Sequence, residues 1–224
     1  MNAIRDCYEL NKRIKEMNLV RLTWGNASVL ESGYVYIKPS GIDVERSPLE
    51  DSFCKVSLAT GENTSQPRKP SVDLDTHLEI YRGFSNASAI IHTHSTYATS
   101  FAQAGVEIPC LGTTHADYFN GSIPVVPYLS DLNDYEKDTG TSIVQHYKQN
   151  DINPEEVNAC LIQGHGVFVW GKTASECLES ALVIEMLAEM AYNSMSINPD
   201  ITFPNHILKK HYERKHGETR YYGQ

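Results

Sequence analysis

Two histidines separated by a single residue close an apolar run, in Ile90-Ile91-His92-Thr93-His94. Side chains two positions apart in a β-strand point to the same face, so both imidazoles would leave that face side by side. Neutral imidazole is a ligand for Zn, Cu, Fe and Ni, and two histidines need only one or two further ligands to complete a site. Taken alone, the motif fits a metal pair and a pair of buried histidines bonded to backbone groups equally well.

A third histidine, His165, stands between Gly164 and Gly166. Flanking glycines permit a close approach of the backbone and leave the imidazole exposed at a turn between strands. A turn histidine is the simplest interpretation of this segment alone. Together with the earlier pair, it predicts a set of three imidazoles that leaves coordination positions open, as in catalytic zinc sites. Asp73 could add a carboxylate as fourth ligand or as a base, or it could cap the helix that follows it.

A polar run, Gly112-Thr113-Thr114-His115-Ala116-Asp117-Tyr118-Phe119, follows the apolar residues 108–111. It could form a loop that delivers Asp117 into a site. A capped turn is the stronger interpretation from the residues alone.

Turns elsewhere could hold an anion, because backbone amides at turns and helix starts form anion-binding concavities. The candidates are Gly25-Asn26, Ser40-Gly41, and Ser71 beside Arg68 and Lys69. Ser-Gly turns are mostly only turns, so each segment carries little weight by itself.

Apolar periodicity predicts the elements that position these residues. Helices are expected over residues 3–17, 73–82, 95–104, 132–149, 173–194 and 204–215. Strands are expected over 20–30, 34–37, 54–58, 89–94, 157–162 and 167–170, the last two joined by the turn that holds His165. The irregular alternation of short strands and helices predicts one α/β domain over residues 1–224, with a mixed, mostly antiparallel sheet covered by helices in three layers.

Composition restricts the class of function. A length of 224 residues suits one domain, and 41% hydrophobic with 21% charged residues is ordinary for a globular protein. The net charge of −9 argues against nucleic acid or an anionic membrane as partner. No apolar run approaches the roughly 20 residues that span a bilayer, and the N-terminus has no apolar signal core. The five scattered cysteines, without a CxxC pair, predict reduced thiols in a cytoplasmic protein.

Short segments spread along the chain also carry a resemblance. In order, they are Gly25-Asn26, Lys38-Pro39-Ser40-Gly41, Ser71-x-Asp73, His92-Thr93-His94-Ser95, the run 112–119, Gly164-His165-Gly166, and the tail from Lys210-His211-Tyr212 through Arg214-Lys215-His216-Gly217 to Tyr221-Tyr222-Gly223-Gln224. The chain resembles, over nearly its whole length, the L-ribulose-5-phosphate 4-epimerase branch of the class II aldolase/adducin-like family. The His-Thr-His and Gly-His-Gly pieces are common to the wider family. The run 112–119 and the Tyr-Tyr-Gly-Gln tail are specific to the epimerase branch.

The resemblance implies a role for individual residues. It implies a divalent metal, zinc or manganese, on Asp73, His92, His94 and His165. It makes Asp117 and Tyr222 an acid/base pair, with Tyr222 in a C-terminal tail that reaches a neighbouring subunit of a homotetramer with shared active sites. It places a sugar phosphate near Gly25, Asn26, Ser40, Gly41 and Ser71, with Lys38 and His211 lining the site.

Two positions depart from the pattern of the epimerases. Val72 stands where a second serine is usual, which removes one phosphate donor, and Val167 stands where proline is common. The alternatives within the resemblance are an aldolase of the same family, in which a glutamate typically stands beside the metal where this chain has Asp73, and an adducin-like binding module without catalysis. The presence of all three histidines argues against the binding module.

Overall fold

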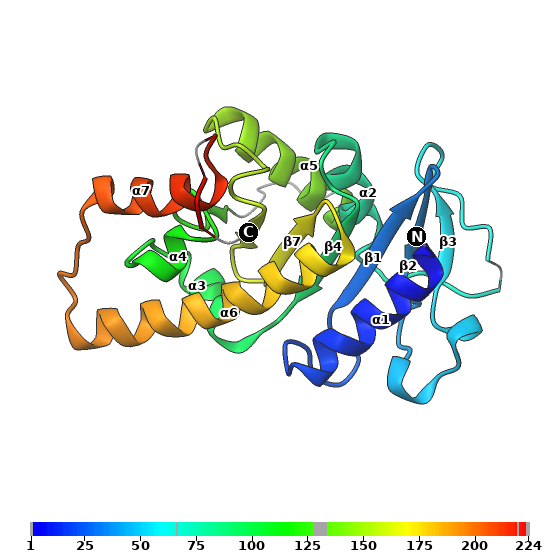
Figure 1. Cartoon of the computed structure of the whole chain (residues 1–224). Coiled ribbons are helices and arrows are strands. Elements are labelled where there is room, and N and C mark those ends of the chain that lie inside the picture. Colours follow the sequence, from blue (N-terminus) through cyan, green and yellow to red (C-terminus); the bar gives the residue numbers. More distant parts are fainter. Residues whose placement is uncertain (1, 66, 128–133, 219, 223–224) are drawn as a thin grey trace.

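The structure is a computed structural model and describes residues 2–65, 67–127, 134–218 and 220–222. These residues form a seven-stranded sheet with helices around it (Figure 1). The strand order is β3-β2-β1-β4-β7-β6-β5. The pair β5–β6 is parallel and the remaining pairs are antiparallel. The strands are β1 (Asn26–Glu31), β2 (Tyr34–Ile37), β3 (Cys54–Ser57), β4 (Ala89–Thr93), β5 (Val125–Val126), β6 (Ala159–Ile162) and β7 (Val167–Gly171).

Helices cover both faces of this sheet. Helices α1, α3 and α6 share one hydrophobic core with it, and α2 and α5 share a second core on the other face. The helices are α1 (Ala3–Glu16), α2 (Leu74–Gly83), α3 (Thr96–Ala104), α4 (Thr113–Ala116), α5 (Tyr135–Gln149), α6 (Ala174–Ile197) and α7 (Asn205–His216), with short 3-10 turns at Val44–Arg46 and Leu49–Asp51. The predicted fold, one α/β domain with a mixed, mostly antiparallel sheet between helical layers, is confirmed.

The central strand β4 is buried along its whole length. Ile91 packs into the core under α1, α3 and α6, whereas its neighbour Ile90 packs into the core under α2 and α5. A strand covered on both faces must be apolar on both, which explains the continuous Ala-Ile-Ile run. Pairing with β1 and β7 places His92 opposite Asn26 on one side and Phe168 on the other. His92 therefore lies near the C-terminal end of the fully buried strand β4.

The loop before β1 differs from the expected strand over residues 20–30. The strand begins only at Asn26, because Leu22 has a φ of 55° and Gly25 a φ of 73°, and both angles interrupt an extended strand. A side chain at Gly25 would also collide with the carbonyl oxygen of His92, 2.7 Å from an ideal Cβ. Glycine thus lets this loop lie directly against the histidine strand.

Other boundaries shift by a few residues, and four short elements were not predicted: the two 3-10 turns, α4 and β5. Helix α4 lies inside the run 112–119, and the two-residue strand β5 extends the sheet next to β6. The expected start of a helix at 132 lies outside the described residues, and α5 begins at Tyr135. The five cysteines are free thiols, and four of them are buried. None of the helices in the described ranges has the length and apolarity needed to cross a bilayer.

Candidate metal centre

The three predicted histidines meet at one end of the sheet. His92 is in β4, His94 follows that strand directly, and His165 is in the turn between β6 and β7. One ring nitrogen from each lies within 4.8 Å of the others, and the Nε2 atoms of His92 and His94 are 3.0 Å apart. The ends of β4, β6 and β7, which are neighbours in the sheet, thus bring the three imidazoles together. The three predicted histidines therefore form a group that could hold a divalent metal ion.

The His92 ring is held in a single orientation. Its Nδ1 donates to the carbonyl oxygen of Val167 at 2.9 Å, and its ring stacks on Phe168 with centroids 4.3 Å apart. A proton on Nδ1 leaves the Nε2 lone pair facing the other two histidines, the arrangement that metal-binding histidines commonly adopt. Burial, the largest influence, lowers the pKa of His92 to about 3. The ring is therefore neutral at physiological pH, as metal binding requires.

Burial also lowers the pKa values of His94 and His165 below the ordinary range. The turn that carries His165 needs Gly166, because an ideal Cβ there would lie 2.5 Å from the carbonyl oxygen of Thr93. Any larger residue would push the turn away from β4 and separate His165 from the other two ligands. The Gly-His-Gly pattern is thus explained by a close approach of two strand ends.

Asp73 occupies the N-cap position of α2, but its side chain makes no capping hydrogen bond. Its Oδ2 instead accepts hydrogen bonds from Asn26 Nδ2 at 2.6 Å and Ser71 Oγ at 3.3 Å. Burial raises the pKa of Asp73, but the nearby imidazoles of His92 and His77 and the hydrogen bond from Asn26 outweigh it, so the pKa lies below its ordinary value. The result is a carboxylate that faces the histidine cluster rather than the helix end.

A cavity of about 510 Å³ lies next to the histidines, and residues of the predicted anion-binding turns line it. Its lining residues are Thr23, Trp24, Gly25, Asn26, Lys38, Ser40, Gly41, Ser71, Val72, Asp73, His92, His94 and His165. Thr23 and Trp24 were not predicted; the only signal for them is that they precede Gly25. The turn residues that were weak indications of an anion site when taken separately therefore line one cavity.

Lys38 is the cation of this cavity. It is buried, and its Nζ donates to the carbonyl oxygens of Thr23 at 3.2 Å and Ile42 at 3.4 Å. Burial lowers its pKa, while the carboxylates of Asp73 and Asp43 oppose that shift. Val72 lines the same cavity with 66% of its surface exposed. The cavity thus combines one ammonium, serine hydroxyls and turn amides with an apolar side chain at its edge.

Asp117, His211 and Tyr222 lie elsewhere in the chain. Asp117 is the C-cap residue directly after α4. His211 Nδ1 lies 3.1 Å from its Oδ1, and the Arg214 guanidinium binds its carboxylate. Tyr222 places its ring 4.4 Å from the guanidinium carbon of the same arginine. The structure brings these residues to one another but not to the lining of the histidine cavity. Nothing in the residue pattern had indicated a role for Arg214.

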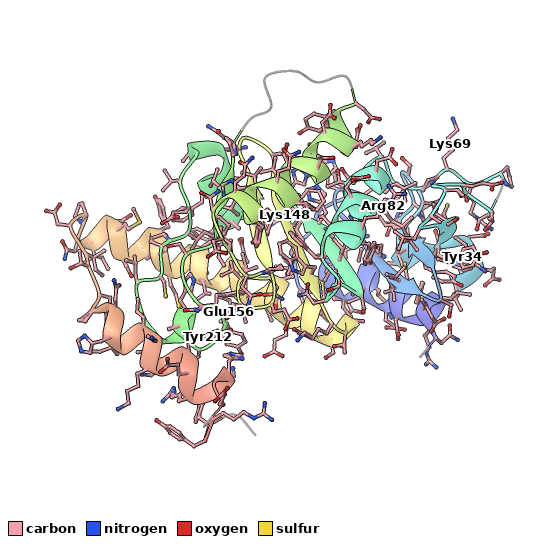
Figure 2. All side chains as sticks on the ribbon, turned by 90° about the horizontal axis from the view of Figure 1, so that it is seen from above. Tyr34, Lys69, Arg82, Lys148, Glu156 and Tyr212 are labelled. Carbon is pink, nitrogen blue, oxygen red and sulfur yellow. The ribbon has the colours of Figure 1, made fainter. Side chains whose placement is uncertain are left out.

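The two groups of residues occupy different parts of the molecule. Helices α4 and α7 lie at the end opposite β1–β3 (Figure 1). Figure 2 shows the molecule from above, with Tyr212 of α7 toward one end and Tyr34 of β2 toward the other. Within one chain, the residues predicted for acid/base chemistry do not line the cavity that contains the residues able to hold a metal.

Comparison with known proteins agrees with this architecture. The family model described as "Class II Aldolase and Adducin N-terminal domain" matches residues 5–192. An L-fuculose 1-phosphate aldolase structure superposes with a TM-score of 0.80 at 20% identity, covering 95% of each chain. An L-fuculose-1-phosphate aldolase from Thermus thermophilus gives 0.70 at 22% identity over 88% of this chain and 97% of that one. A sugar-phosphate aldolase from Thermotoga maritima gives 0.69 at 20% identity over 91% and 97%.

Proposed function

The chain belongs to the class II aldolase and adducin family, and from that premise we propose that it is a metal-dependent epimerase that interconverts L-ribulose 5-phosphate and D-xylulose 5-phosphate. One observation carries the proposal: the three histidines and the turns suited to a phosphate line a single cavity. A sugar phosphate could therefore reach the metal with its ketone end while its phosphate rests on the turns.

Inversion at carbon 4 of such a sugar is difficult because its hydrogen, β to the ketone, is not acidic. The chemical solution is to break and remake the C3–C4 bond as an aldol. A base removes the C4 hydroxyl proton, the C3–C4 electron pair passes to the ketone fragment, and the aldehyde fragment turns before C3 attacks its other face. When bound, zinc or manganese supplies Lewis-acid stabilisation of the negative charge on the ketone fragment.

His92, His94 and His165 would hold that metal, with Asp73 as fourth ligand or neighbouring carboxylate. Lys38, with the hydroxyls of Ser40 and Ser71 and the amides of Gly25 and Gly41, would hold the phosphate. This grip matters because the aldehyde fragment carries the phosphate, and its escape would turn an epimerase into an aldolase.

Two proton-transfer groups are needed, since the C4 hydroxyl loses its proton on one side of the aldehyde fragment and, once that fragment has turned, the new C4 alkoxide takes a proton from the other side. We assign them to Asp117 and Tyr222, which the resemblance to epimerases favours. Because neither lines the cavity of its own chain, they would serve the cavity of a neighbouring subunit in a homotetramer with shared active sites. Their placement around Arg214 supports this assignment, because one arginine holds both groups together as a unit.

The second candidate is an aldolase that releases the fragments, and the sugar-phosphate aldolases among similar structures support it. One assay separates the two. The zinc-loaded protein is incubated with L-ribulose 5-phosphate, and products are identified by chromatography. D-xylulose 5-phosphate supports the epimerase; dihydroxyacetone and glycolaldehyde phosphate support the aldolase. If neither forms, while an established epimerase is active in the same buffer, the proposal is wrong.

A further inference from the structure

The first residue of α5, Tyr135, lies beside the third histidine. Its hydroxyl oxygen is 3.3 Å from Nδ1 of His165, and the two ring centroids are 6.0 Å apart. We propose that Tyr135 is a positioning residue of the metal centre, whose hydroxyl accepts the Nδ1 proton of His165 and thereby directs Nε2 toward the metal. The inference rests on the metal centre of the proposed function but not on its substrate.

His165 needs such a partner more than His92 does. The His92 ring is fixed by a backbone carbonyl and by stacking on Phe168, inside a buried strand. His165 sits instead on a turn between two strands, after Gly164 with a φ of 71°. A metal-binding histidine commonly donates its second N–H to an acceptor, which selects the tautomer and restrains the ring. The Tyr135 hydroxyl is placed to supply that acceptor.

The start of α5 is itself held firmly against α2. Thr76 Oγ1 donates to the carbonyl oxygen of Glu136 at 2.6 Å, one residue beyond Tyr135. At Gly140 an ideal Cβ would lie 2.8 Å from the carbonyl oxygen of Thr76, so glycine permits the two helices to touch. Since α2 begins directly after Asp73, the α2–α5 contact holds the first turn of α5, which carries Tyr135, against the helix that follows Asp73.

The competing role for Tyr135 is contact with the substrate, because 41% of its surface is exposed. The two roles differ in what they require. A positioning residue acts on the metal in the absence of any sugar phosphate, and it acts through His165. A substrate contact changes neither the metal affinity nor its dependence on His165.

The test is the zinc affinity of Tyr135→Phe, measured by titration of metal-free protein against a chromophoric chelator without substrate. Removing the hydroxyl should weaken zinc binding about 10-fold, the lower end of the effect of losing an outer partner of a metal ligand. Tyr34→Phe, which removes the hydroxyl of a similarly exposed tyrosine in β2, is the matched control and should bind zinc as the unaltered protein does.

A double-mutant cycle with His165→Ala decides whether the effect passes through the histidine. With His165 absent, Tyr135→Phe should cause no further loss of zinc affinity. An equal loss in both backgrounds would mean general destabilisation and would overturn the proposal. So would an unchanged zinc affinity, including one accompanied by a raised KM, which would identify Tyr135 as a substrate contact. The zinc titration remains decisive even if the epimerase assay fails.

Discussion

Arg214 binds Asp117 through two hydrogen bonds from one nitrogen, with Nη2 2.9 Å from Oδ2 and 3.1 Å from Oδ1. A third contact, from Nε to Oδ1 at 3.3 Å, fixes the plane of the guanidinium against the carboxylate. The same guanidinium faces the ring of Tyr222, and the backbone N–H groups of Tyr221 and Tyr222 donate to the carbonyl oxygen of Arg214. One arginine therefore organises both residues assigned to proton transfer.

Asp117→Asn should lower kcat by roughly 10²–10⁴-fold, the usual cost of losing a proton-transfer group. Asparagine keeps the shape of the side chain and a carbonyl oxygen for Arg214 but cannot take a proton. Zinc content, measured by atomic emission on the same preparation, should not change, because Asp117 does not line the histidine cavity. A variant that lost its zinc along with its activity would contradict this assignment.

The C-terminal tail offers a matched pair of tyrosines. Deleting residues 221–224 should abolish turnover and leave zinc content intact, because Tyr221 and Tyr222 do not line the cavity. Tyr222→Phe should reproduce most of the loss, since phenylalanine keeps the ring over Arg214 but has no proton to transfer. Tyr221→Phe is the control and should retain activity. Full activity in Tyr222→Phe would show that this residue is not the second acid/base.

The placement of the metal residues followed from local sequence, whereas the placement of Asp117 did not. His92, His94 and His165 sit at strand ends, and strand ends adjacent in a sheet bring their side chains together. Asp117 contacts Arg214 across 97 residues of sequence, and no periodicity links a four-residue helix to α7. Long-range polar pairs of this kind depend on how whole elements dock.

Asp73 and Ser95 illustrate a second limit of sequence reasoning. Both occupy N-cap positions, which aspartate and serine favour, yet neither side chain caps its helix. Asp73 is held by Asn26 of β1 and by Ser71, two residues before it, and the start of α3 is capped by Glu185 from α6. Residue type indicated where each helix begins, but tertiary neighbours decided which group bonds to which.

Glu185 should therefore be a stabilising residue. Its carboxylate accepts hydrogen bonds from the backbone N–H groups of Tyr97 at 2.8 Å and Ala98 at 3.0 Å, at the positive end of the α3 dipole. Glu185→Ala should lower the free energy of unfolding by about 1 kcal/mol, as loss of a cap does. Ser95→Ala should cost less, because its hydroxyl does not cap. Urea titrations would measure the free energy of unfolding of both variants. A larger loss in Ser95→Ala than in Glu185→Ala would contradict the assignment of Glu185 as the cap.

Stability should also fall in mild acid because of His77, a buried residue of α2. Its Nδ1 is 2.7 Å from Ser28 Oγ, which also contacts the Tyr81 hydroxyl at 2.8 Å. Nε2 is buried with no hydrogen-bond partner among the described residues. Burial, partly opposed by Asp73, lowers the pKa of His77 to about 4. A charged ring in this position would lose the hydration that it has in the unfolded chain.

The sign of the effect follows from proton uptake in the two states. Between pH 6.5 and 4 the unfolded chain binds a proton at His77 and the folded protein does not, so the free energy of unfolding decreases as pH falls through this range. The stabilisation is complete above pH 6.5, and its loss should approach about 3 kcal/mol near pH 4.

His77→Leu, which leaves the Ser28–Tyr81 contact in place, should show a shallower decline in urea titrations of metal-free protein, although it is less stable at neutral pH. Other buried histidines are present in both proteins, so the difference between the two pH profiles reports His77 together with its interaction with Asp73. Parallel profiles would mean that His77 takes up its proton over the same pH range in the folded and unfolded states, so that its pKa is not lowered by folding.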